Sequence, residues 1–199
     1  MKKILIIHEG EKTEKNYINN FGRLARNENP NIIFVTKTMK GISVKNYLNK
    51  VAEIIRKEKE KYEHCLVWMD FDIFKRKNID ADKIKNNIEQ IKLHKKFKLT
   101  GKVKTVFNYM NCEDLLILHS SDENINKWQK ICEKCNHINN PMDSHNYLLK
   151  YKEIFPDYKK NEPIYIDVDV FKKAVTNSND EDILFSSEIL NALDSILFA

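Results

Sequence analysis

The chain has 199 residues, of which 42% are hydrophobic and 32% charged, with a net charge of +5, and these values are typical of a soluble globular protein of one domain. No apolar run approaches the roughly 20 residues of a membrane-spanning helix, and the N-terminal apolar stretch is too short for a signal peptide. We therefore expect a cytoplasmic protein that has no membrane partner.

The first 110 residues alternate between apolar strands and amphipathic helices. Continuous Ile, Leu and Val runs predict buried strands, and apolar residues at helical spacing predict the segments between them. Strands are expected over residues 3–8, 31–38, 64–70 and 102–110, and helices from Thr13, over 43–62 and over 80–96. This order predicts the α/β class, a parallel sheet with helices on both faces.

The pattern becomes helical after residue 110. Helices are expected over residues 111–119, 122–136, 144–155, 167–176 and 181–197. We therefore divide the chain into an α/β core, residues 1–120, and a helical C-terminal extension, residues 121–199, that packs on this core. The loop at 139–143 is a candidate hinge.

The four cysteines are expected to be free thiols in a cytoplasmic protein. Cys132 and Cys135 form a CxxC pair with His137 close by, which allows a zinc site. A structural zinc ion needs four ligands, and the sequence has no second pair at a suitable spacing. The pattern around the pair favours an amphipathic helix whose cysteines partly face the core.

Carboxylates follow two of the predicted strands. Glu9 comes directly after the first strand, and Asp70 and Asp72 come at the end of the third. Ligands of open parallel sheets bind beyond the carboxyl ends of the strands. Two aspartates at this spacing point the same way if the strand stays extended, and they repel each other unless a cation such as Mg²⁺ lies between them. The alternatives are a strand-end turn for the aspartates and a solvated loop position for Glu9.

A third acidic pair, Glu113 and Asp114, begins an apolar helix. The pair either interacts with the helix dipole or adds a carboxylate to the same site. His119 is expected to be a hydrogen-bonded core or boundary histidine rather than a metal ligand. Near the first strand, Thr13 is a candidate helix cap, Glu14 belongs to the first helical turn, and Glu11 is expected to be solvated.

The segments ILIIHEGEKTEKNY, VWMDFD and NCEDLLILH resemble the three motifs of RloB-like proteins, whose core is similar to the Toprim fold. The family pattern is a strand followed by EGxxTE and an aromatic residue, a strand ending in DxD, and a Phe-Glu-x-Trp-Leu-Leu-x-His-like helix. The resemblance covers residues 3–120. The matching residues are Glu9, Gly10, Thr13, Glu14 and Tyr17 in the first motif, Asp70 and Asp72 in the second, and Glu113, Leu116 and His119 in the third.

The third motif departs from the family pattern at two positions. Cys112 replaces Phe and Leu115 replaces Trp, and both replacements are apolar. The resemblance implies that Glu9 acts in acid–base chemistry or metal binding and that Asp70 and Asp72 bind Mg²⁺ or Mn²⁺, with Glu113 as a fourth carboxylate. It also implies a partner ATPase in a bacterial anti-phage, or abortive-infection, system.

The function expected from these residues is a metal-dependent nuclease that hydrolyses phosphodiester bonds in DNA or RNA. Lys12 and the run Lys75, Arg76 and Lys77 are candidate phosphate contacts, and the alternative is that each is an exposed solubilising residue. Residues 1–100 contain 23 Lys and Arg against 13 Asp and Glu, and residues 101–199 contain 11 against 16. A basic half favours a polyanion partner, although the scarcity of arginine is more typical of a compositional bias.

Two rival functions remain open from the sequence. One is a non-catalytic Toprim-like module that binds nucleic acid or a partner, and the other is phosphoryl chemistry on a nucleotide or a protein. The chain has no GxxxxGK[ST] motif, so we expect any ATPase activity to come from the partner. A homo-oligomer is also compatible with the sequence.

Overall fold

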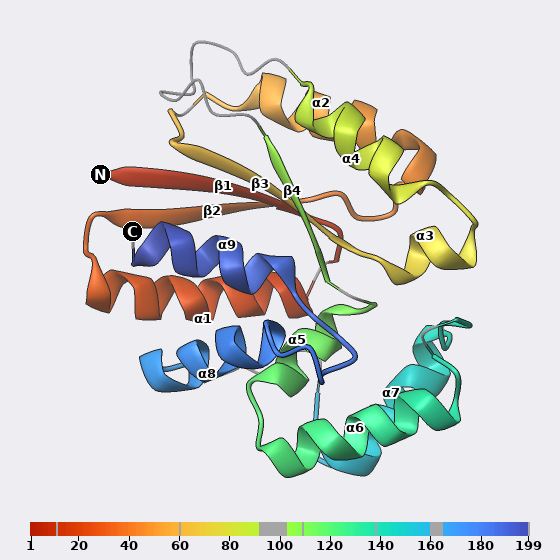
Figure 1. Ribbon diagram of the computed structural model, residues 1–199. Coiled ribbons are helices and arrows are strands. Elements are labelled where there is room, and N and C mark those ends of the chain that lie inside the picture. Colours follow the sequence, from red (N-terminus) through yellow and green to blue (C-terminus); the bar gives the residue numbers. More distant parts are fainter. Residues whose placement is uncertain are drawn as a thin grey trace.

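The computed structural model describes residues 1–10, 12–59, 61–91, 103–108, 110–137, 139–159 and 165–198. In these residues, four parallel strands form one sheet in the order β2-β1-β3-β4 (Figure 1). The strands are β1 (Lys2–His8), β2 (Ile32–Thr38), β3 (His64–Asp70) and β4 (Lys104–Asn108). The predicted α/β class is therefore confirmed, and the four strands lie where the sequence predicts them, within two residues at each end. Residues 102 and 109 of the predicted fourth strand lie outside the described residues.

Helices cover both faces of the sheet, as Figure 1 shows. On one face, Leu5 and Ile7 of β1 pack in a cluster with residues of α2 (Tyr47–Lys57), α3 (Asp72–Arg76) and α4 (Ala81–Glu89). On the other face, Ile4 and Ile6 pack with α1, α5, α8 and α9. These four helices are α1 (Thr13–Glu28), α5 (Cys112–Leu118), α8 (Val168–Ser178) and α9 (Glu188–Leu197). A strand that is buried on both faces reads as a continuous apolar run, which is why the sequence indicates β1 so clearly.

The C-terminal helices share the core of the second face. Trp128 of α6 (Asp122–Lys134), Phe171 of α8 and Leu193 of α9 belong to the same buried cluster as Ile4. The chain also returns to the edge of the sheet, where Ser187 forms an isolated antiparallel bridge with Asn108 of β4. The helical C-terminal part is therefore present as predicted, and the domain boundary at residue 120 stays a prediction.

Three predicted helices are shorter in the structure. The segment 43–62 begins with a 3-10 turn at Val44–Asn46, and its helix ends at Lys57. Beyond this end, the Glu58 carboxylate accepts a hydrogen bond from the Tyr62 hydroxyl and pairs with Lys37, which directs the chain back to the sheet. The helix predicted over 80–96 ends at Glu89, and residues 92–96 lie outside the described residues.

The helix predicted over 181–197 begins only at Glu188. The preceding residues form turns, in which the Asp180 carboxylate accepts a hydrogen bond from the backbone N–H of Asp182. Ser187 then pairs with the sheet and the helix follows directly. The acidic turn and the sheet contact therefore outweigh the helical spacing of the apolar residues. The remaining helix of the C-terminal part is α7 (Ser144–Ile154).

All four cysteines are free thiols in the described part of the chain. Cys132 is buried on the core side of α6, and Cys135 is half-buried at the end of the same helix, in agreement with the amphipathic interpretation of the CxxC pair. None of the described helices is long and apolar enough to cross a membrane.

Candidate active site

A cavity of about 340 Å³ lies at the carboxyl ends of β1 and β3. The loop after β1, the junction of β3 and α3, and the first turn of α5 form its walls, so it joins the three segments that carry the sequence motifs. Five carboxylates line it: Glu9, Glu14, Asp70, Asp72 and Glu113. The four predicted catalytic residues therefore lie around one cavity, together with Glu14, which the sequence analysis assigns only to the helix start.

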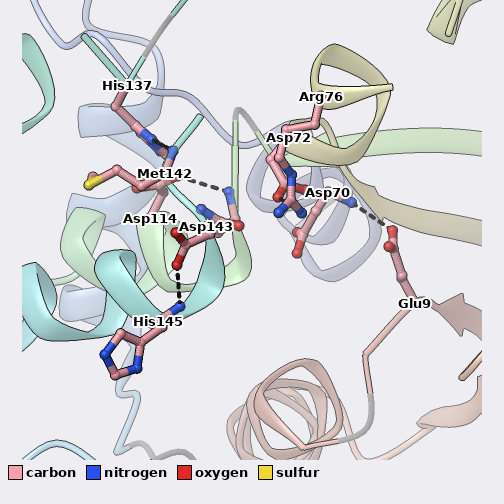
Figure 2. Close-up of polar contacts among 10 residues, drawn as sticks. Glu9, Asp70, Asp72, Arg76, Asp114, His137, Met142, Asp143 and His145 are labelled. Atoms are coloured by element: carbon pink, nitrogen blue, oxygen red, sulfur yellow. Dashed lines mark hydrogen bonds and ion pairs between the residues drawn. The ribbon is translucent and has the colours of Figure 1, made fainter. Parts of the chain in front are cut away.

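Glu9 lies between two hydrogen-bond donors. Its Oε2 accepts from the backbone N–H of Asp70 at 3.3 Å (Figure 2), and the Tyr47 hydroxyl at the start of α2 donates to the same carboxylate. Burial raises the pKa of Glu9 to about 7, with the charges of Asp72 and Glu14 adding to the rise and the two hydrogen bonds opposing it. Tyr47 is missing from the sequence prediction, because its helical spacing identifies it only as a core residue.

The backbone conformation that brings Asp70 and Asp72 to the cavity is a strand followed directly by a helix. The strand ends at Asp70, Phe71 has helical backbone angles, and Asp72 is the first residue of α3. The DxD segment therefore does not stay extended, which is the condition under which the sequence places both side chains on the same side. The reason is that the Phe71 ring packs on Phe74 and Phe107, which turns the chain into a helix at once.

Each aspartate has a partner in the described residues. Asn108 donates to Oδ1 of Asp70 at 2.9 Å, and the Ser187 hydroxyl donates to the other end of the Asn108 amide at 2.7 Å. Asp72 forms an ion pair with Arg76, one turn along α3. The hydrogen bonds from Ser187 to Asn108 and from Asn108 to Asp70 thus fix which end of the amide faces Asp70.

Burial raises the pKa of both aspartates. For Asp70 the charges of Glu14 and Glu9 add to the effect of burial, and the pKa lies well above its usual value. For Asp72 burial outweighs the opposing effect of Arg76. Acidic groups that repel one another in a desolvated space favour a bound cation.

The donor set of the cavity fits a hard divalent cation such as Mg²⁺ or Mn²⁺, which takes carboxylate oxygens. In the described residues, however, no three His, Cys, Asp or Glu side chains are placed to hold one ion together. Arg76 is the cation beside Asp72 in this arrangement. Because this ion pair uses Oδ2 of Asp72, a metal ion would compete with Arg76 for the carboxylate.

Hydrogen-bond donors line the same cavity. Lys12 and Arg76 belong to its wall, as the sequence predicts for phosphate contacts, whereas Lys75 and Lys77 lie outside it. Asn111 also lines the cavity, and its Nδ2 is buried without a hydrogen-bond partner in the part of the chain that the structure describes. The sequence motifs do not include Asn111 among the site residues, although its place directly before the acidic start of α5 is a signal for a helix cap.

Gly10 permits the close approach of Glu14 to the backbone. The Gly10 N–H donates to Oε1 of Glu14 at 2.7 Å, and a Cβ atom on Gly10 would lie 2.1 Å from that carboxylate. Thr13, predicted as the cap, is instead the first residue of α1 and makes no capping bond. The hydrogen bond at the start of α1 is instead the one that the Glu14 carboxylate accepts from the Gly10 N–H group in the preceding turn. Glu11 lies outside the described residues.

A family model for "RloB-like protein" matches residues 4–189, nearly the whole chain. The chain belongs to the RloB-like family. No curated protein and no solved structure gives a significant match. The match extends about 70 residues beyond the motif-bearing segment, so most of the helical C-terminal part belongs to the family model as well.

The third RloB-like motif separates its two acids into different roles. Glu113 lines the cavity and accepts a hydrogen bond from Tyr158 at 3.4 Å. Asp114 is buried: Tyr147 and Trp128 donate to its Oδ1 at 2.7 and 2.8 Å, and the backbone N–H of Asn111 donates to its Oδ2. Burial raises the pKa of Asp114 to about 6. Asp114 therefore connects the start of α5 to α6 and α7.

The histidine of the third RloB-like motif is a boundary residue, as the sequence predicts. Its Nδ1 lies 2.8 Å from the carbonyl oxygen of Leu115, so this nitrogen carries the proton. The Nε2 of His119 then accepts from the Tyr17 hydroxyl at 3.1 Å. Tyr17 in turn packs edge-on against Trp68 of β3. The aromatic residue of the first motif and the histidine of the third therefore stabilise the fold below the cavity.

Tyr17→Phe tests this assignment. The substitution removes the hydroxyl and leaves the buried Nε2 of His119 without its donor, so we expect a loss of about 1 kcal/mol in the free energy of unfolding. Chemical denaturation measures this loss. Metal-dependent thermal shifts should stay unchanged, because neither residue lines the cavity, and a large change in them would contradict the assignment.

The pH dependence of the free energy of unfolding tests the raised pKa of Glu9. Because the pKa of Glu9 rises from 4.5 to about 7 on folding, the folded state holds a proton that the unfolded state has lost between these pH values. Stability should therefore fall as pH rises through this window, and Glu9→Gln should recover on the order of 2 kcal/mol at pH 8. Urea unfolding in EDTA at several pH values measures both effects. Equal stability of the two proteins at pH 8 would contradict the prediction.

Proposed function

We propose that this RloB-like protein is a nuclease that uses Mg²⁺ or Mn²⁺ to hydrolyse phosphodiester bonds in DNA or RNA, with an ATPase partner in anti-phage defence. The observation that carries the proposal is the cavity with five carboxylates at the carboxyl ends of two adjacent parallel strands. This is the place at which open α/β sheets bind ligands, and the donor set suits metal-assisted hydrolysis. A Toprim-like arrangement of the core belongs to the same proposal.

Four of the five carboxylates have a role in the proposed reaction. Asp70 and Asp72 would hold the metal ion, with Glu9 or Glu113 completing its oxygen ligands. When bound, the ion would stabilise negative charge on the phosphoryl group and lower the pKa of an attacking water molecule. A pKa of about 7 suits Glu9 to accept a proton at neutral pH. Tyr47 is a positioning residue, since its hydroxyl orients that carboxylate.

The donors of the cavity wall would bind the phosphate itself. Arg76 and Lys12 bring positive charge to the carboxylate cavity, and the unpartnered Nδ2 of Asn111 supplies a neutral donor. Donors that are already fixed in a desolvated site favour the charge that develops on phosphate oxygens. A metal ion held by Asp72 would compete with Arg76 for this carboxylate, and Arg76 would then be placed to bind the substrate phosphate.

A non-catalytic module is the second candidate function. The observation that favours it is the ion pair between Arg76 and Asp72, together with the absence, in the described residues, of three side chains placed to hold one ion. In that case the carboxylates would serve binding of nucleic acid or of the ATPase partner. The two functions differ in one result, the cleavage of nucleic acid.

The test is a cleavage assay on a mixed panel of single-stranded and duplex DNA and RNA, including structured RNA, with Mg²⁺ or Mn²⁺ and with or without the partner ATPase. We expect cleavage by the wild type that EDTA abolishes. If the wild type with its partner cuts no nucleic acid in the panel, the nuclease proposal is wrong. Turnover of a small phosphate ester or a phosphoprotein, without nucleic-acid cleavage, would instead support phosphoryl chemistry on another substrate.

A further inference from the structure

A second cavity lies beside the carboxylate site. It has a volume of about 410 Å³, and it is formed by α3, the turn into α4 and the loop between α6 and α7. Phe71 provides aromatic surface, Lys75 provides a positive charge, and Asn78, Asp82 and Asn139 provide polar groups from three different segments. Asn78 has a positive φ of 48° in the turn after α3, which places it at this edge. None of these residues belongs to the proposed hydrolytic machinery.

The lining of this second cavity fits a nucleobase better than a phosphate. Asp82 would repel a phosphate, whereas its carboxylate accepts hydrogen bonds from the amino and ring N–H groups of a base. The two asparagine amides donate and accept, as the edge of a base requires. An aromatic ring offers stacking, which every base can use. The combination of one ring, two amides and one carboxylate is therefore selective for a planar polar ligand.

Phe71 connects the two cavities along the chain. It is the residue between Asp70 and Asp72, so consecutive residues of the chain line the two cavities. The Nζ atom of Lys75, which also lines the second cavity, lies 6.0 Å from the centre of the Phe71 ring. This contact is of the cation–π type.

Lys75 brings a positive charge to the second cavity, and Arg76 follows it directly in α3. His137, in the loop between α6 and α7, has its pKa lowered to about 4 by burial and by the charges of Lys75 and Arg76. The α6–α7 loop therefore lies within electrostatic reach of both basic side chains of α3. In Figure 2, His137 and Met142 of this loop lie across from Arg76 and Asp72. The phosphates on either side of a bound base would meet this charge.

We propose that the second cavity binds an unpaired nucleobase adjacent to the scissile phosphate, with Phe71 as the stacking platform and Asn78, Asp82 and Asn139 at the base edge. The inference rests on the proposed nucleic-acid substrate and narrows it to single-stranded or locally unpaired nucleic acid. A base inside a duplex is stacked on both faces and cannot enter such a cavity without leaving the helix.

Binding tests this inference without cleavage. Short single-stranded oligonucleotides that carry 2-aminopurine are titrated with the full chain in Ca²⁺, in the Asp70→Asn background, beside the same sequences in duplex form. We expect tighter binding of the single strands and quenched 2-aminopurine fluorescence on binding. Phe71→Ala should weaken binding about tenfold and abolish the quenching, and Phe71→Trp should restore both.

Two further variants distinguish a loss of binding from a loss of folding. Asn139→Ala changes an exposed loop residue and should weaken binding about threefold. Tyr165→Ala removes an aromatic residue that is 84% exposed far from the carboxylates in the sequence, and it should change nothing. Unchanged binding in both Phe71→Ala and Asn139→Ala, or equal affinity for duplex and single strands, would overturn the inference.

The binding experiment, together with the cleavage assay, separates this inference from the proposed function. If the wild type cleaves nucleic acid but Phe71→Ala neither binds more weakly nor loses quenching, the nuclease proposal stands and the base site is wrong. If the wild type never cleaves but binds single strands in a Phe71-dependent way, the base site stands and the nuclease proposal fails.

Discussion

Asp70→Asn is expected to lower the rate of nucleic-acid cleavage by about a thousandfold or more while the protein stays folded. The substitution keeps the shape of the side chain but removes the charge at the point where β3 enters the cavity. Because burial and the neighbouring acids hold the pKa of Asp70 well above its usual value, ionised Asp70 destabilises the folded state at neutral pH. The variant should therefore be at least as stable as the wild type at pH 8 in EDTA.

The control is Asp182→Asn, which removes the same charge from an exposed turn outside the cavity. Cleavage is measured on the best substrate of the panel, and melting temperatures are measured with EDTA and with Mg²⁺. Mg²⁺ should raise the melting temperature of the wild type and of Asp182→Asn, but not that of Asp70→Asn. An active Asp70→Asn protein would remove this carboxylate from the mechanism, and an equal Mg²⁺ shift in all three would place the metal elsewhere.

Asp114→Ala is expected to cost about 3 to 4 kcal/mol in the free energy of unfolding. The side chain accepts hydrogen bonds from Trp128, Tyr147 and the backbone of Asn111, and its loss leaves all three donors buried without an acceptor. The helices α5, α6 and α7 should loosen together. This is the largest effect on stability that we expect from any single substitution near the cavity.

The neighbouring residue provides the matched comparison. Glu113→Ala should change stability by less than about 1 kcal/mol, because the hydrogen bond that its carboxylate accepts from Tyr158 is long, at 3.4 Å. Its effect should appear in cleavage, which we expect to fall by about a hundredfold. Chemical denaturation and the cleavage assay of both variants would show the division of roles. A stable Asp114→Ala protein, or a strongly destabilised Glu113→Ala protein, would contradict it.

The sequence predicts the sheet and the meeting of the motifs because both follow from local patterns. A strand buried on both faces has to be a continuous apolar run, and the ends of parallel strands meet at one edge. Glu9 and Asp70 could therefore be placed together from the sequence. The role of each in catalysis stays a prediction.

The side chains that complete the cavity could not be predicted in this way. Tyr47 looks like any core residue of an amphipathic helix, and only the packing of α2 over the strand ends brings its hydroxyl to Glu9. Asn111 and Glu14 resemble ordinary helix-start residues. The turn at Phe71 depends on an aromatic contact with Phe107, which is distant in the sequence. Such contacts exist only after the chain has folded.

The hydrogen bond from Ser187 to Asn108 determines when the contacts of Asp70 can be completed during synthesis of the chain. All five carboxylates precede Ser187 in the chain. The Ser187 hydroxyl donates to the amide oxygen of Asn108, which leaves the amide N–H group to face Asp70. The hydrogen bonds around Asp70 can therefore be completed only after the chain has been synthesised through Ser187, well after every carboxylate of the cavity.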